Sequence, residues 1–152
     1  DTVEKTTSRK ITLSNGNDVV LTGMCKGAAM IGPNMATMLC VILTDASLLP
    51  EQAQDILCRA ADCTFNCISV EGHTSTSDTV LLMANGMANP GPLPEADLSP
   101  FADALIDVCA ELARMIPNDG EGVSHLAVCA SLALRQGNQS AGRGILRGGC
   151  LV

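Results

Sequence analysis

The sequence predicts an α/β protein in which helices are layered on a sheet. Short β-rich runs alternate with helix-like runs along the chain, and this order favours a layered sheet-and-helix architecture. Hydrophobic residues make up 47% of the 152 residues, which is enough for the core of one domain. The sequence has two Phe and neither Tyr nor Trp, so this core must be built from aliphatic side chains, Met, Ala and Cys.

The first half of the chain carries most of the strand signals. The run KITLSNGNDVVLTG predicts a hairpin that turns around Asn15-Gly16. The run TMLCVILTD is apolar throughout and of strand length, which predicts a strand buried on both faces. We expect a helix from Pro50 to Ala61, with its proline at an early position, and another short strand at CISVEG.

The second half is dominated by helix signals. TSTSDTVLLMANG predicts a Ser/Thr-rich loop, a cap at Ser77 or Asp78, and one or two helical turns that stop at Gly86. After a proline-rich connector, Ser99 is expected to cap the clearest helix, which has Pro100 at its first position and ends at Pro117. Its apolar positions follow the i, i+3, i+4, i+7 pattern: Phe101, Ala104, Leu105, Val108, Cys109, Leu112 and Met115.

Charge is distributed unevenly along the chain. The formal net charge is −7, and all 16 acidic residues precede His125. An acidic body argues against a nucleic-acid partner. Arg135, Arg143 and Arg147 in the Gly-rich tail are a weak signal for one, and a solvated tail is the simpler interpretation. Since no apolar run approaches 18 residues, we expect no membrane span.

Seven of the eight cysteines fall into two groups. Those within apolar patterns are expected to act as small buried hydrophobes: Cys25, Cys40, Cys109 and Cys129. The others that cluster are Cys58, Cys63 and Cys67, with His73 nearby. Common zinc modules have a two-residue gap between paired cysteines, and this cluster does not. We therefore expect no metal site, with a thiol or zinc module kept as an alternative.

The Ala36-Thr37 bond permits two interpretations. Thr37 can simply open the following strand as a β-branched residue. Alternatively, its hydroxyl can attack the carbonyl of Ala36, and hydrolysis of the resulting ester would release a chain that begins at Thr37. An N-terminal threonine carries its own base, because its α-amino group has a pKa of about 8. Spacing alone does not decide between the two.

Three ordered motifs bear on this choice: GMCKGAAMIGPNMATMLCVILTDA, FNCISVEGHTSTSDTVLLMANG and NDGEG. Together they resemble the ornithine acetyltransferase, or glutamate N-acetyltransferase (ArgJ), family, and the opening DTVEK resembles the segment that precedes them there. The similarity covers Asp1 to Val123. It implies the layered α/β fold shared with the self-cleaving, DmpA-like aminopeptidases, incomplete in this chain. Residues 1–36 would end the family's α chain, 37–124 would begin its β chain, and 125–152 would form a divergent Gly/Arg-rich tail.

The resemblance also implies a function. Family members cleave themselves before the motif threonine, and their two chains stay associated, with a higher oligomer expected. They move acetyl from N-acetylornithine to glutamate through an acetyl-threonine ester, in arginine biosynthesis. Some also use acetyl-CoA as donor, and no cofactor is implied. Carried over by motif, Ala36-Thr37 is the cleavage site, Thr37 the nucleophile, and Lys26, Thr37 and Glu121 bind substrate. The compartment would be the bacterial cytoplasm or the mitochondrial matrix.

Several departures keep alternatives open. The family's oxyanion-hole Thr-Gly pair lies upstream of this segment and its last third lies downstream. The chain starts with Asp1, not Met, which suggests a processed chain or an excerpt. Gly32 and Cys67 replace an Ala-like residue and an Arg. The alternatives are an inactive truncated fragment and a related self-cleaving aminopeptidase or amidohydrolase. Lys26 and Glu121 could also be ordinary surface residues.

Overall fold

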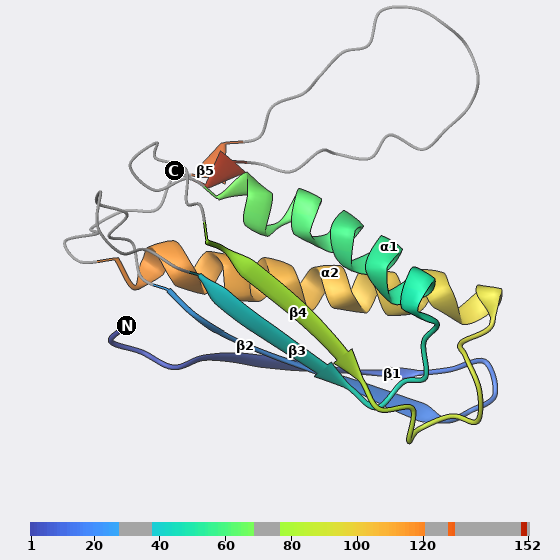
Figure 1. Cartoon of the computed structure of the whole chain (residues 1–152). Coiled ribbons are helices and arrows are strands. Elements are labelled where there is room, and N and C mark those ends of the chain that lie inside the picture. Colours follow the sequence, from blue (N-terminus) through green and yellow to red (C-terminus); the bar gives the residue numbers. More distant parts are fainter. Residues whose placement is uncertain (28–37, 69–76, 121–127, 130–149, 152) are drawn as a thin grey trace, which may run out of the picture.

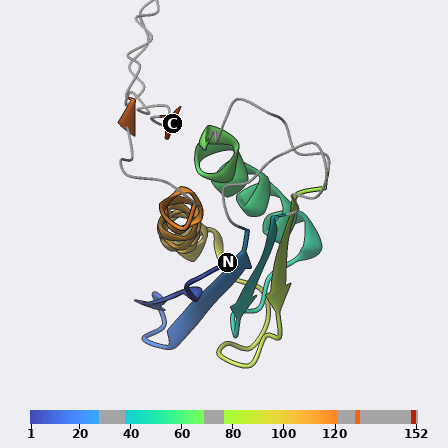
Figure 2. The same cartoon turned by 90° about the vertical axis from the view of Figure 1, so that its left-hand side faces the viewer.

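The computed structural model of this chain describes residues 1–27, 38–68, 77–120, 128–129 and 150–151. Most of them form a four-stranded sheet in the order β1-β2-β3-β4. Helices α1 and α2 lie together on one face of this sheet (Figures 1 and 2). Two short strands, β5 (Val128–Cys129) and β6 (Cys150–Leu151), pair separately as an antiparallel ribbon. The predicted α/β class with layered helices and sheet is confirmed.

The predicted hairpin is present and extends further than its sequence signal. β1 (Lys5–Thr12) and β2 (Asp18–Lys26) pair antiparallel from Thr12↔Asp18 to Lys5↔Cys25. The amide of Gly16 donates to the carbonyl of Leu13 at 2.9 Å. Gly16 has a φ of 85°, a conformation that only glycine adopts at little cost. The turn chemistry of Asn15-Gly16 therefore fixes the register of both strands.

A parallel crossover follows the hairpin. β3 (Leu39–Thr44) pairs antiparallel with β2 and parallel with β4 (Thr79–Ala84), and α1 (Pro50–Cys63) makes the connection. Parallel neighbours require such a crossover. The prediction of a helix from Pro50 is confirmed. A 3-10 turn, η1 (Phe65–Cys67), ends with the first residue of CISVEG, and residues 69–72 of that expected strand lie outside the described residues.

The prediction of helical turns before Gly86 is wrong, because that segment is strand β4. An apolar run as short as VLLMA fits a strand as well as a helical turn. Pairing with β3 decides between them, since it satisfies the backbone groups of both strands. The expected stop is correct, because Gly86 follows the strand with a φ of 71°.

The clearest predicted helix is confirmed as α2 (Glu95–Asn118), but it begins earlier than expected. Pro94 is its N-cap residue, not Ser99, and Pro100 lies inside the helix. A proline near a helix start forfeits few intrahelical bonds, so tertiary contacts can extend the helix beyond it. Asp97 supplies them: its carboxylate accepts hydrogen bonds from the amide and hydroxyl of Ser14, both at 2.9 Å.

The core lies between the helices and the inner face of the sheet. Its fully buried side chains come from both layers: Val19, Leu21, Cys40, Ile42, Phe101, Leu105, Val108, Cys109 and Leu112. α2 packs against β1, β2 and α1. Gly23 permits the close approach of α2, because a Cβ there would lie 2.7 Å from the side chains of Leu112 and Val108.

Candidate functional site

The predicted site residues belong to segments that leave the sheet at one end. Lys26 is the exposed last residue of β2 and pairs with Leu39, the first residue of β3. Ala36, Thr37 and Glu121 lie outside the described residues, but Thr37 is bonded to Met38 and Glu121 to Gly120. The described neighbours therefore show where the chain enters and leaves the regions that carry these three residues.

Strand direction brings these element ends together. β2 runs antiparallel to both β1 and β3, so its last residues face the start of both strands. β4 runs parallel to β3, and its first residue, Thr79, pairs with Leu39. The C-terminal end of α2 lies over the same end of the sheet (Figure 1). The ends of five elements therefore meet at this end of the sheet. Lys26 is the last residue of one of them, β2.

Asp78 holds the residue that follows Thr37. The amide of Met38 donates to Oδ1 of Asp78 at 3.0 Å, and the carbonyl of Met38 accepts from the amide of Thr79 at 2.9 Å. Both polar groups of the Met38 backbone are thus fixed by the start of β4. Sequence reasoning treated Asp78 as one of two candidate helix caps; in the structure its carboxylate accepts from the start of β3 instead.

A buried charged network joins the C-terminal end of α2 to the sheet. The ammonium of Lys5 contacts the carboxylate of Asp119, and both side chains are 1% exposed. Lys5 Nζ also donates to Oδ1 of Asp1 at 2.7 Å. Thr2 adds its hydroxyl and its amide, which lies 3.0 and 3.1 Å from the two carboxylate oxygens of Asp119. Hydrogen bonds from Lys5 and then Thr2 hold the pKa of Asp119 well below its usual range.

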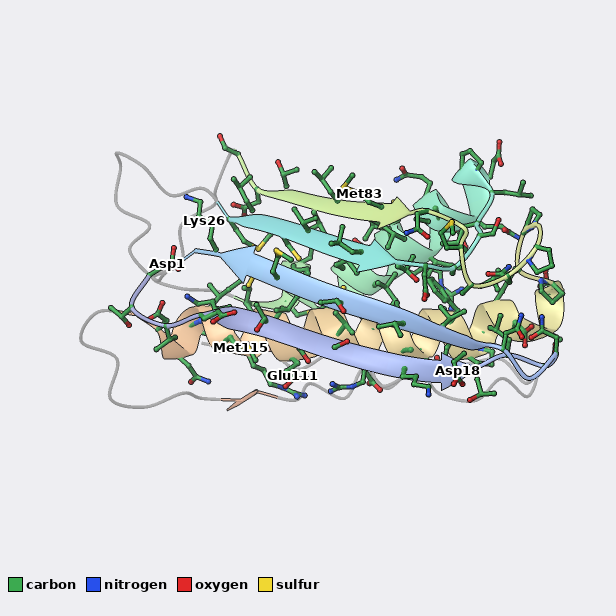
Figure 3. All side chains as sticks on the ribbon, turned by 90° about the horizontal axis from the view of Figure 1, so that it is seen from below. Asp1, Asp18, Lys26, Met83, Glu111 and Met115 are labelled. Carbon is green, nitrogen blue, oxygen red and sulfur yellow. The ribbon has the colours of Figure 1, made fainter. Side chains whose placement is uncertain are left out.

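The network continues to Gly27, the residue that follows β2. Oδ1 of Asp1 also accepts from the amide of Gly27 at 3.0 Å. Gly27 has a φ of 149°, and a Cβ placed there would lie 3.5 Å from Cα of Met38. Asp1 and Lys26 lie at the same end of the sheet (Figure 3). Hydrogen bonds therefore run from Asp119 through Lys5 and Asp1 to Gly27, and Gly27 lies close to Met38, the residue beside Thr37.

Sequence reasoning missed Asp1, Lys5 and Asp119 as site-related residues. DTVEK and NDGEG were noted only as parts of the family motifs. A usable signal was present in the period-2 pattern of β1, which places Lys5, Thr7 and Arg9 on one face. That face is the one toward α2. A lysine directed into a protein interior requires a carboxylate partner, and that requirement could have led to Asp119.

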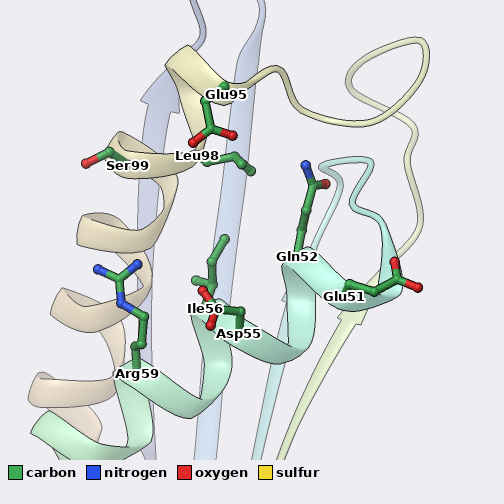
Figure 4. A pocket seen from close by; sticks show the side chains of 8 residues that line it. All are labelled: Glu51, Gln52, Asp55, Ile56, Arg59, Glu95, Leu98 and Ser99. Atoms are coloured by element: carbon green, nitrogen blue, oxygen red, sulfur yellow. The ribbon is translucent and has the colours of Figure 1, made fainter.

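A separate hollow lies at the opposite end of the molecule. Its volume is about 390 Å³, and it lies between the first turns of α1 and α2 (Figure 4). The residues that line it are Glu51, Gln52, Asp55, Ile56, Arg59, Glu95, Leu98 and Ser99. Three carboxylates and one guanidinium give it a negative charge. Lys26, the predicted site residue that the structure describes, is not among the residues that line it.

The cysteines show how burial changes thiol chemistry. Cys40 and Cys109 are buried and Cys25 is half-buried, as expected for small hydrophobes. Desolvation raises the pKa of Cys40 and of Cys109 to about 12, and that of Cys25 to about 11. Cys58 and Cys63 are exposed. Within the described part of the chain, no three His, Cys, Asp or Glu side chains gather as metal ligands would.

Comparison with known proteins agrees with the motifs and the fold. The sequence profile of the ArgJ family matches residues 1–140. The chain belongs to the ArgJ family. The match extends past Val123, where the motif resemblance ended, so part of the divergent tail also falls within the ArgJ profile.

Curated ArgJ relatives are much longer than this chain. An arginine biosynthesis bifunctional protein ArgJ from Nitratidesulfovibrio vulgaris is 47% identical over 124 residues, which is 82% of this chain but 31% of the relative. A glutamate N-acetyltransferase from Methanopyrus kandleri is 43% identical over 122 residues, or 80% of this chain and 32% of the relative. The chain thus spans about a third of the length of these ArgJ proteins.

Solved structures extend the comparison to the fold. The ArgJ protein of Bacillus halodurans superimposes with a TM-score of 0.51 and 39% identity, over 57% of this chain and 44% of that one. An aminopeptidase from Ochrobactrum anthropi with a variant Ntn hydrolase fold gives a TM-score of 0.51 at 14% identity, over 74% of this chain and 39% of that one. The second likeness supports the fold alone. In the described residues of this ArgJ chain, no helix is long and apolar enough to cross a membrane.

Proposed function

We propose that this chain is the central segment of a glutamate N-acetyltransferase of arginine biosynthesis. The observation that carries the proposal is the ArgJ match over residues 1–140, which includes Lys26, Ala36, Thr37 and Glu121. Relatives with 43% to 47% identity bear the names glutamate N-acetyltransferase and arginine biosynthesis bifunctional protein. The activity belongs to the full-length protein, because the chain spans about a third of those relatives.

The first step is self-cleavage at Ala36-Thr37. Oγ1 of Thr37 attacks the carbonyl carbon of Ala36, the peptide C–N bond breaks, and the nitrogen keeps its proton and gains the hydroxyl proton. Water then hydrolyses the ester, which leaves a carboxylate on Ala36 and a free α-amino group on Thr37. The hydrogen bonds of Met38 to Asp78 and Thr79 support this proposal, since a nucleophile works best beside a fixed backbone.

Acetyl transfer follows in two balanced steps. The α-amino group of Thr37 takes the hydroxyl proton as Oγ1 attacks the acetyl carbonyl of N-acetylornithine. The amide C–N bond breaks and the proton goes to the departing amine. Ornithine is released, and the acetyl group stays on Thr37 as an ester. The amine of glutamate then attacks the ester carbonyl, the C–O bond breaks, and the proton that the amine loses passes through the α-amino group of Thr37 to Oγ1. In members that use acetyl-CoA, its thioester would supply the acetyl group in the first step.

Two charged residues bind the substrates in this proposal. The ammonium of Lys26 pairs with a substrate carboxylate, and the carboxylate of Glu121 pairs with an ammonium group of ornithine. The exposed position of Lys26 at the end of β2, opposite the first residue of β3, supports its role. The two cleaved chains stay associated and assemble further. The compartment is the bacterial cytoplasm or, as in relatives from Sclerotinia sclerotiorum and Penicillium rubens named as mitochondrial, the mitochondrial matrix.

The deciding experiment replaces Thr37 with Ala in the full-length protein. Intact-mass spectrometry should find only uncut chain, and acetyl transfer from N-acetylornithine to glutamate should fall by several orders of magnitude, as when other enzymes lose a nucleophile. Thr37→Ser should retain both activities. Thr6→Ala is a matched control, because Thr6 is an exposed threonine of β1. Acetyl transfer that persisted in Thr37→Ala would refute the nucleophile assignment.

A further inference from the structure

Two ion pairs connect β1 to α2 or to the residue that caps its C-terminal end, and they differ in their surroundings. Arg9 Nη2 lies 2.6 Å from Oε2 of Glu111, with side chains that are 41% and 37% exposed. Lys5 and Asp119 form the other pair, with both side chains 1% exposed. The first pair is an ordinary surface contact that contributes little to stability. The second is buried, and burial of charges requires a different explanation.

Stability alone does not explain the Lys5–Asp119 pair. Removing two charges from water costs several kilocalories per mole for each ion, and well-packed apolar residues of similar size often stabilise a protein as well or better. What such a pair provides is a fixed geometry, because the ammonium and carboxylate oxygens must remain in contact once buried. The question is therefore which parts of the molecule this geometry fixes.

The partners of the pair answer that question. Asp119 is followed by Gly120, which is bonded to Glu121. On the other side, Lys5 donates to Asp1, and Asp1 accepts from the amide of Gly27, which is bonded to Lys26. The Lys5–Asp119 pair thus connects the backbone next to Glu121 with the backbone next to Lys26. The Arg9–Glu111 pair is next to neither Lys26 nor Glu121 in the sequence.

We propose that Lys5 and Asp119 are positioning residues. Through Asp1 they hold the backbone at Gly27, next to Lys26, against the backbone at Asp119 and Gly120, next to Glu121. This inference rests on the proposed function for the roles of Lys26 and Glu121. In this proposal the network acts through the backbone and not by contact with substrate. It joins the described backbone next to each proposed binding residue, so that one amino-acid substrate can be bound at both ends.

The kinetic test uses Asp119→Asn in the full-length protein, with Glu111→Gln as the matched control. Both changes remove a carboxylate that pairs with β1: Glu111 lies within α2, and Asp119 caps its C-terminal end. Asp119→Asn should raise KM for N-acetylornithine about tenfold while self-cleavage still goes to completion. Glu111→Gln should change KM less than twofold. Equal effects of the two variants on KM would overturn the proposal.

A double-variant cycle separates positioning from general destabilisation. If Asp119 acts through Glu121, then Asp119→Asn should change KM less than twofold in a protein that already carries Glu121→Gln. A purely structural role predicts that the two effects multiply, and that result would contradict the proposal. Asp1→Ala is a second variant that does not threaten folding, because the side chain of Asp1 is 36% exposed. It should raise KM severalfold, and an unchanged KM would count against the network.

A measurement without catalysis keeps this inference distinct from the proposed function. Amide exchange of Gly27, followed by ¹⁵N NMR, should be about tenfold faster in Asp1→Ala and severalfold faster in Asp119→Asn than in Glu111→Gln. If the protein transferred no acetyl, the proposed function would fail, yet this measurement would still decide whether Asp119 fixes Gly27. Unchanged exchange in both network variants would refute the coupling.

Discussion

The two faces of the sheet carry similar side chains in very different environments. On the inner face, Leu21, Cys40 and Ile42 are at most 1% exposed beneath the helices. On the outer face, apolar residues of β2, β3 and β4 are 37% to 57% exposed: Val20, Met24, Leu39, Leu43, Leu81 and Met83. Met83 is seen on this outer face in Figure 3. The outer face of β1 is polar instead, with exposed Thr6, Ser8, Lys10 and Thr12.

This comparison corrects one sequence prediction. TMLCVILTD was expected to form a strand buried on both faces, and β3 is indeed a strand. Within the described residues, however, its outer side chains Leu39 and Leu43 remain 43% and 41% exposed. An apolar residue in a sequence reports that burial is favourable, not that a neighbour covers it. In the described structure, helices cover only the inner face of the sheet. The packing of that face should therefore dominate the free energy of unfolding.

The sharpest contrast should appear in thiol reactivity. Burial raises the pKa of Cys40 and Cys109 from 9.0 to about 12, so at pH 8 each should hold about a thousandfold less thiolate than an unshifted thiol. Alkylation by iodoacetamide, mapped by mass spectrometry, should label exposed Cys58 much faster than Cys40 or Cys109, because burial also shields the two inner thiols from the reagent. In urea, which unfolds the chain, the three cysteines should be alkylated at similar rates. Similar rates in the folded chain would show that the inner face opens readily.

A change at Gly23 should have the next largest effect. Gly23→Val places a branched side chain where a Cβ alone would lie 2.7 Å from Leu112 and Val108. The overpacking should lower the free energy of unfolding by about 1–3 kcal/mol in urea titrations of the purified chain. Thr22→Val is the matched control at the adjacent position of β2 and should stay within about 0.5 kcal/mol. If Gly23→Val were equally mild, α2 would not pack as closely as the structure shows.

The smallest effect is expected on the outer face. Leu43→Thr introduces a β-branched residue suited to a strand and replaces an apolar side chain that is already 41% exposed. The free energy of unfolding should change by no more than about 0.5 kcal/mol. Its inner neighbour provides the contrast, since Ile42→Thr buries an unpaired hydroxyl and should cost about 1–3 kcal/mol. A loss of more than about 1 kcal/mol in Leu43→Thr would mean that this face is covered in solution.

Local signals account for much of the fold. The hairpin, the start of α1 at Pro50 and the apolar stripe of α2 depend on turn chemistry and helical periodicity, and these act between near neighbours. The errors occur where distant residues decide. β4 is a strand because β3 pairs with it, and α2 begins before Pro100 because Asp97 bonds Ser14 across the chain.

The candidate site divides in the same way. Motif resemblance supplied Lys26, Ala36, Thr37 and Glu121, of which only Lys26 lies within the described residues. Nothing local connects Lys5 with Asp119, which are 114 positions apart in the chain, or Asp78 with Met38. Long-range pairing of this kind depends on how the strands and α2 align, which no short window of sequence encodes.

The sequence by itself determined that this chain is an aliphatic α/β protein of the ArgJ family, because composition, periodicity and motif order are properties of the residues alone. The tertiary structure decided which end of the sheet gathers the element ends, which charges are buried there, and which apolar face the helices cover. The physical reason is that a buried charge or an apolar side chain has its energy set by whatever surrounds it after folding.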